Sequence, residues 1–269
     1  MTSNNGDPLL QPLQLKHLTL RNRVMSTAHA CGLEDRDAMP GEAYQAYHEA
    51  KARGGLALTM FGGSAFVDRD STWASGQLDM SNDRIVPFLE QFSGRIHGAG
   101  AAIMMQISHL GRRAETNSQN WLPAIGPSPV RETLHRAFPR EMDRQDIERV
   151  VRAFGAAARR AQQGGLDGIE TMVGGHLIGQ FLSPMTNQRS DEFGGSVENR
   201  CRFGLMVHEE IRRQVGDEFI VGMRFLIDEA DSAGLDFDTC VEMARVFQDS
   251  GLIDFFNANY GRIDTMHRM

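Results

Sequence analysis

The sequence contains little cysteine and no long apolar run. Its three cysteines, Cys31, Cys201 and Cys240, are widely spaced and include no CxxC pair, which is typical of a reducing compartment. Three cysteines cannot by themselves supply the four thiolates of a usual iron–sulfur cluster. No segment is long and apolar enough to span a bilayer, and the first 15 residues lack the basic and apolar regions of a secretory signal. We therefore expect a cytoplasmic protein without a membrane partner.

Basic residues are also scarce. The chain has 28 Lys and Arg against 35 Asp and Glu, a net charge of −7 and an isoelectric point near 5.7. Nucleic-acid binders need clustered basic side chains that replace counterions on phosphates, so this balance argues against a nucleic-acid partner. With 269 residues, of which 41% are hydrophobic, the chain can build a substantial core. We expect its partner to be a small-molecule substrate.

Six short apolar segments alternate with helical segments along the chain, which predicts parallel strands joined by right-handed crossovers. Before them, residues 9–20 predict a hairpin or plug. Residues 112–143 contain four prolines and so predict a long loop rather than a helix or central strand. The expected strands are residues 23–28, 55–61, 101–107, 167–172, 218–225 and 252–258. The expected helices are residues 41–53, 85–97, 144–163, 197–215 and 236–250.

This alternation indicates an α/β fold, a TIM (β/α)8-type barrel truncated after the sixth strand. A closed barrel needs two more β/α units, whose loops usually hold the phosphate of a ligand. We therefore expect residues 1–269 to form one FMN-binding β/α barrel domain, incomplete at the C-terminus. An open barrel edge exposes unpaired strand backbone, so association of copies into a homo-oligomer is a further expectation.

The segment from residue 167 to 200 organises the rest of the chain. It reads as a buried strand, a glycine turn, a short apolar helix, a polar loop and a second helix. A polar loop of this length at the carboxyl end of a barrel strand predicts a ligand site. Its run FLSP-TNQR-D-FGGS-ENR-RF resembles the Old Yellow Enzyme family of flavin mononucleotide (FMN) oxidoreductases. Within that family the chain is most similar to the dienoyl-CoA reductase and trimethylamine dehydrogenase branch, and residues 121–143 resemble the N-methylproline demethylases.

The resemblance implies a set of FMN-binding residues. Arg224 matches the arginine that stabilises negative charge on the reduced flavin, and Gln106 matches a glutamine at the flavin's pyrimidine edge. Arg224 could instead pair with Asp228 or Glu229. The run SHLGRR matches the family's H-x-G-R motif and places His109 and Arg112 near the site, where either could also simply anchor the long loop.

Backbone groups of Thr27 and Ala28 and the glycine Gly62 complete the expected FMN contacts. Gly62 and its neighbour Gly63 would let the main chain approach the ring, although a tight turn would also require them. The cysteine that links flavin covalently in the amine dehydrogenases aligns with Ala30, one place before Cys31. The FMN is therefore expected to be non-covalent, with Cys31 a packed thiol.

His176 and Tyr260 are the expected catalytic residues, and no metal ligand is expected. His176 stands near the position of the tyrosine proton donor of ene reductases, and the segment before it is one residue shorter than theirs. It could orient a carboxylate, act as a general base, or be a structural histidine. Tyr260 and Trp73 could form aromatic walls for a methylated amine, or could belong to the core.

The expected function is FMN-dependent oxidative N-demethylation of a methylated amino acid or amine, by hydride transfer to flavin. The alternatives are an NAD(P)H-dependent ene reductase acting on an enoyl thioester or another activated alkene, and a non-catalytic barrel fragment. Relatives in this branch continue into a 4Fe–4S segment and into domains for FAD or NAD(P)H. Those cofactors are expected only if a longer parent chain exists.

Overall fold

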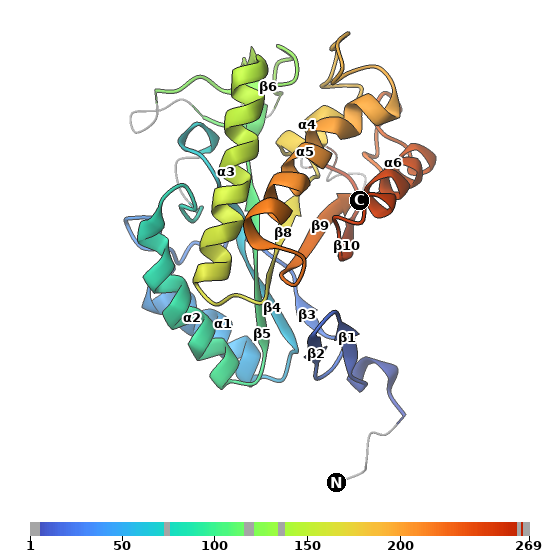
Figure 1. The fold of residues 1–269 in the computed structure, drawn as a ribbon. Helices are drawn as coiled ribbons and strands as arrows, with labels where there is room; N and C mark the ends of the chain where they lie inside the picture. Colours follow the sequence, from blue (N-terminus) through green and yellow to red (C-terminus); the bar gives the residue numbers. More distant parts are fainter. Residues whose placement is uncertain (1–5, 73–75, 116–120, 134–137, 263–264, 266–269) are drawn as a thin grey trace.

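The computed structural model describes residues 6–72, 76–115, 121–133, 138–262 and 265. Its centre is a sheet of six parallel strands whose spatial order follows the chain (Figure 1). This confirms the predicted β/α barrel arrangement with six strands. In sheet order the strands are β3 (Met25–Ser26), β4 (Leu58–Phe66), β5 (Ala102–Ser108), β8 (Gly168–Met172), β9 (Ile220–Leu226) and β10 (Phe255–Asn259).

Helices cover the outer face of this sheet, where alternate strand residues such as Ile103, Ile169 and Val221 enter the main core. Each helix was expected from the alternation of strand and helix segments, and the boundaries agree within one residue. None of the helices in the described residues is long and apolar enough to cross a membrane. They are α1 (Glu42–Arg53), α2 (Val86–Gly98), α3 (Arg144–Gln163), α5 (Val197–Val215) and α6 (Phe237–Asp249), with the short α4 (Leu177–Leu182) over the carboxyl end of β8.

Local sequence signals fix the ends of α3. Asp143 accepts a hydrogen bond from the Asp146 backbone N–H, and the Asp146 side chain accepts one from the Asp143 backbone N–H. This reciprocal capping box satisfies two N–H groups that the first helical turn leaves without partners. The helix ends before Gly164. The helix that packs across the centre of the outer face therefore starts and stops where its sequence specifies.

The inner face of the sheet is closed at its amino-terminal end by the predicted hairpin. Strands β1 (Leu13–Leu15) and β2 (Leu18–Leu20) pair antiparallel, and Leu20 packs in a second apolar cluster with Leu58, Met104 and Ile220. This cluster fills the base of the inner face. Polar side chains are left only nearer the carboxyl ends of the strands, where barrel enzymes place their sites.

Strand β4 differs from the prediction. The glycine pair after Phe61 indicated a turn, but the strand continues to Phe66 and its pairing with β5 shifts register between Phe61 and Ala65. Within this bulge Ser64 has a φ of 66°, a left-handed conformation that is unfavourable for a residue with a side chain. The bulge turns Ser64 toward the site described below. A further short parallel pair, β6 (Ile125–Gly126) and β7 (Arg140–Glu141), lies within the predicted long loop.

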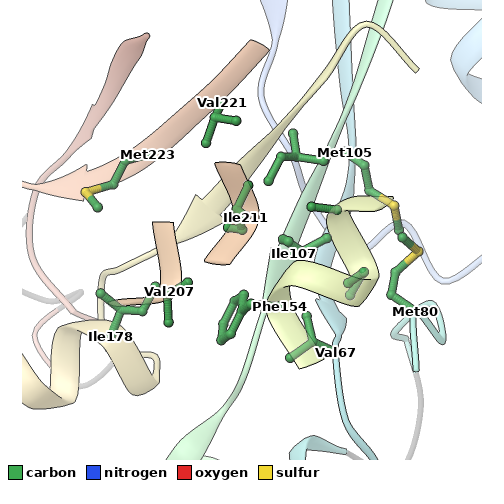
Figure 2. Close-up of a cluster of buried hydrophobic side chains, with 14 of the residues drawn as sticks. Val67, Met80, Met105, Ile107, Phe154, Ile178, Val207, Ile211, Val221 and Met223 are labelled. Atoms are coloured by element: carbon green, nitrogen blue, oxygen red, sulfur yellow. The ribbon is translucent and has the colours of Figure 1, made fainter. Parts of the chain in front are cut away.

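The core between α3, α5 and the sheet gives a stability prediction. Phe154 is fully buried and lies among Ile107, Val207 and Ile211 (Figure 2). Phe154→Ala should lower the free energy of unfolding by about 3–5 kcal/mol, because it removes apolar contact and leaves a cavity. Urea denaturation measures the loss. Arg152→Ala on the exposed side of the same helix should change stability by less than about 0.5 kcal/mol; an equal loss in both variants would contradict this packing.

Candidate active site

Three polar side chains from three strands meet on the inner face of the sheet. Glu170 of β8 is fully buried, and its carboxylate accepts hydrogen bonds from Gln106 Nε2 of β5 at 2.8 Å and from Asn257 Nδ2 of β10 at 2.7 Å. Gln106 and Glu170 face each other directly across the parallel pair. They lie beyond the apolar plug and so form the first polar layer of the inner face. We call Gln106, Glu170 and Asn257 the inner polar layer.

The bond between Asn257 and Glu170 crosses strand β9, which lies between their strands. Gly222 of β9 stands opposite both Glu170 and Phe255. A Cβ atom at this position would lie 2.1 Å from the Phe255 ring, so a side chain here would displace that ring. The absence of a side chain at residue 222 therefore leaves space for Phe255.

Arg224 extends the inner polar layer along β9. It stands opposite Met172 on one side and Asn257 on the other. Its Nη1 atom is buried and has no hydrogen-bond partner among the described residues. Among the described residues Arg224 forms no ion pair with Asp228 or with Glu229, and Glu229 instead holds Arg262 at 3.1 Å. A buried guanidinium nitrogen without a partner is costly and indicates a site for an acceptor group of a ligand.

The electrostatics of Glu170 reflect this setting. Burial raises the pKa of its carboxyl above the ordinary value, against the lowering effect of its two amide donors and of Arg224. Both of its oxygens accept N–H groups, which suits the ionised form. The structure therefore places a carboxylate and a guanidinium together at the inner face.

Ser64 connects the inner polar layer to His176. Its backbone N–H donates to Gln106 Oε1 at 3.2 Å, and its hydroxyl lies 2.7 Å from His176 Nε2. His176 Nδ1 lies 2.9 Å from the Gly174 carbonyl, which can only accept, so Nδ1 carries the proton and Nε2 accepts from Ser64. Both ring nitrogens are thus engaged inside the chain. Burial, reinforced by the charge of Arg113, lowers the pKa of His176 to about 3, so the ring is neutral at neutral pH.

The residues expected at the flavin's other contacts lie at the carboxyl ends of β3 and β4. Thr27 is exposed and Ala28 half-buried, directly after β3. Gly62 has a φ of 93°, and a Cβ there would lie 2.8 Å from the Gln106 carbonyl oxygen. At Gly63 a Cβ would lie 2.2 Å from the backbone of residues 29 and 30. Both glycines are therefore required by close approach within the chain, and their contacts with flavin remain a prediction.

His109 and Arg112 hold the loop beyond β5. His109 Nδ1 accepts from the Gly111 backbone N–H, so its Nε2 donates to the buried carboxylate of Asp70 at 2.8 Å. Arg112 donates to the carbonyls of Val130 and Arg131. These contacts correspond to the anchoring alternative of the sequence analysis, although Arg112 also lines a cavity at the barrel mouth.

That cavity lies where the segments after β5, β8, β9 and β10 converge. Three of its lining residues are arginines, Arg112, Arg113 and Arg262, and two are the buried acids Glu132 and Glu229. Arg113 Nη1 lies 3.5 Å from His176 Nδ1, so the cavity adjoins the histidine. Tyr260, just after β10, is 45% exposed, and the expected aromatic wall at Trp73 lies outside the described residues.

Glu170 and Ser64 were not identified from the sequence. The signal for Glu170 was a charged residue inside the otherwise apolar strand GIETM, which demands a buried partner. Ser64 carried no comparable signal, because its left-handed conformation and its contact with a histidine 112 positions away arise only in the folded chain. Alternation along the sixth strand predicts that some of Asn257, Asn259 and Tyr260 point inward, and Asn257 does so in the structure.

The chain is similar in sequence to a known protein family. Residues 8–263 match the model of the NADH:flavin oxidoreductase / NADH oxidase family. The chain belongs to this family. Membership implies a flavin cofactor, and the buried Arg224 nitrogen without a partner fits such a ligand.

Two curated relatives match almost the whole chain. A multifunctional alkene reductase/demethylase OYE of Caballeronia cordobensis is 58% identical over 98% of this chain. A probable N-methylproline demethylase of Rhizobium meliloti (strain 1021) is 47% identical over 97% of it. The chain spans 39% and 38% of the lengths of these two family members.

The chain has the same fold as a solved structure of 2-naphthoyl-CoA reductase in complex with 2-naphthoyl-CoA. The two superpose with a TM-score of 0.90 at 25% identity, covering 96% of this chain and 41% of the reductase. The resemblance to the Old Yellow Enzyme family and to its demethylase and CoA-reductase branch is thus confirmed.

His176 gives a pH prediction. An unfolded histidine titrates near pH 6.5, whereas folded His176 titrates near 3, so below pH 6.5 the unfolded chain binds the proton preferentially. The stabilising contribution is complete above pH 6.5 and is lost as the pH falls toward 3. Between pH 7.5 and 5 it should fall by about 2 kcal/mol.

Urea denaturation at these two pH values measures the effect. The drop in unfolding free energy should be about 2 kcal/mol smaller in His176→Gln than in the wild type. His17→Gln, at an exposed histidine, should keep the wild-type drop. Equal drops in wild type and His176→Gln would show that folded His176 is not held neutral.

Proposed function

We propose that this chain is the flavin-binding part of an enzyme that oxidatively N-demethylates a methylated amino acid or amine. The observation that carries the proposal is the arginine-lined cavity beside His176. Its three arginines outnumber its two acids, Glu132 and Glu229, one of which holds Arg262. Guanidinium groups match carboxylates in geometry and charge, so the remaining positive charge suits the carboxylate of an amino acid. The names of the two curated relatives, which both include demethylase, support the same substrate class.

FMN would be held by the residues around the inner polar layer. Arg224 would meet the electron-rich edge of the ring with its buried guanidinium, Gln106 would meet the pyrimidine edge, and Gly62 would let the main chain approach. Thr27 and Ala28 would add main-chain contacts. We propose non-covalent binding, because Ala30 stands where a linking cysteine is expected and Cys31 packs against the main core. A 4Fe–4S cluster and an FAD or NAD(P)H site would belong to a longer parent chain.

Bound FMN would supply the acceptor for a hydride from the substrate's N-methyl carbon. Water would then add to the resulting iminium and release formaldehyde and the demethylated amine. His176, neutral and hydrogen-bonded through both nitrogens, would position the substrate through Ser64, whose hydroxyl it holds, rather than remove a proton. Tyr260 would provide an exposed aromatic wall, which suits a cationic amine.

The second candidate is an NAD(P)H-dependent reductase of an activated alkene. The name of the 58% identical relative includes alkene reductase as well as demethylase, which supports this candidate. Against it, His176 stands near the position at which the ene reductases have their tyrosine proton donor. The third candidate, a barrel portion that binds no flavin, predicts no spectral change on addition of FMN.

The test is an FMN titration of the purified chain followed by anaerobic addition of substrates, with the visible flavin spectrum as the readout. N-methylproline should bleach the bound flavin and release about one equivalent of formaldehyde, while proline, its matched control, should do neither. Bleaching by NADH and recovery with an activated alkene, without a response to N-methylproline, would overturn demethylation in favour of the second candidate. Absence of FMN binding would overturn both for this chain.

A further inference from the structure

Glu170 has no role in the reaction described above, yet it is the most deeply buried charged group of the inner face. It lies directly opposite Gln106 and is bonded to it through Nε2 at 2.8 Å. A buried carboxylate is costly unless it is hydrogen-bonded. An apolar residue at this position would extend the apolar cluster at the base of the inner face. The acid therefore points to a function that an apolar residue could not serve.

The hydrogen bonds around Gln106 fix the orientation of its amide. On one side the Ser64 backbone N–H requires an acceptor, and on the other the Glu170 carboxylate requires a donor. Only one of the two possible amide orientations satisfies both. Turning the amide over would set an NH2 group against the Ser64 N–H and an oxygen against the carboxylate. One N–H of Nε2 and one lone pair of Oε1 then remain for a ligand.

We propose that Glu170 is a positioning residue of the flavin site, which locks the Gln106 amide so that a defined donor and acceptor face the ligand. This rests on the proposed FMN site for its functional consequence but not for its geometry. A flavin pyrimidine edge also carries donors and acceptors in fixed order, so an amide that turned freely would meet it in the wrong orientation part of the time. Holding the amide before binding avoids that cost.

Two substitutions of Glu170 test whether a hydrogen-bond acceptor at residue 170 holds the Gln106 amide in its orientation. Glu170→Met has nearly the same shape but no acceptor for Gln106. Glu170→Gln keeps one acceptor, because Asn257 has no other side-chain hydrogen bond among the described residues and can turn to meet the new amide. Glu170→Gln is therefore the matched control, with the charge removed and the lock retained.

The first readout needs no flavin. Hydrogen exchange of the Ser64 N–H reports whether Gln106 Oε1 stays in place, and that of the Ala102 N–H, which donates to the Ala57 carbonyl, reports general opening. In Glu170→Met, exchange at Ser64 should be at least about tenfold faster relative to Ala102. In Glu170→Gln it should stay within about threefold of the wild type.

The second readout is the dissociation constant for FMN, measured by flavin fluorescence. It should rise at least about tenfold in Glu170→Met and less than about threefold in Glu170→Gln. Unchanged Ser64 exchange in Glu170→Met, or equal effects in both variants, would overturn the proposal. If the wild-type chain fails to bind FMN, the proposed function fails for this chain while the exchange measurement still decides the role of Glu170.

If Glu170→Met does not fold, the double variant Glu170→Met with Asn257→Leu replaces it. Removing the second polar partner as well avoids leaving a buried donor without an acceptor, which is the costlier change. Its reference is Asn257→Leu alone, which leaves the bond between Gln106 and Glu170 intact, so the two are compared with each other and not with the wild type. Both readouts should be at least about tenfold higher in the double variant than in Asn257→Leu, and equal values would overturn the proposal.

Discussion

The carboxylate of Glu170 constrains every residue around it. A charge that is fully removed from water must be surrounded by donors, and here strands on both sides of β8 supply them, through Gln106 and Asn257. Arg224 adds a compensating positive charge. The spacing of parallel strands brings these groups together only if each side chain points inward, so the register of four strands is tied to one ionised group.

Two positions with unusual local requirements, Gly222 and Ser64, lie near Glu170. Gly222, opposite Glu170 on the neighbouring strand, leaves space for the Phe255 ring, with which a side chain there would collide. Ser64 has a left-handed backbone conformation, which costs conformational energy. In this conformation it contacts both Gln106 and His176. Strained residues of this kind concentrate at functional sites. Hydrogen bonds through Ser64, Gln106, Glu170 and Asn257 therefore connect β4, β5, β8 and β10 into one network.

Much of the fold could be predicted because its signals are local. The helices alternate with apolar strand segments, and this pattern depends on residues close together in the chain, so their bounds could be predicted to within one residue. The end of β4 was missed because glycines at Gly62 and Gly63 indicate a turn in isolation, whereas here they allow a bulge within a paired strand. Tertiary pairing overrode the local preference.

The site was less predictable from the residues alone. Arg224 and Gln106 came from the family resemblance, and Asn257 from strand alternation. The importance of Glu170 depends on which side chains of β5 and β10 face it, and no single segment contains that information. Likewise the low pKa of His176 follows from burial and from Arg113, which is 63 residues away.

The central claim, that the inner polar layer and Arg224 form a flavin site, is tested most directly by comparing FMN affinity in two charge-matched variants. Arg224→Met removes the buried guanidinium, and Arg245→Met removes an exposed one on α6. A flavin site at Arg224 predicts a dissociation constant at least about tenfold higher in Arg224→Met and within about threefold of the wild type in Arg245→Met. Equal affinity in Arg224→Met and the wild type would contradict it.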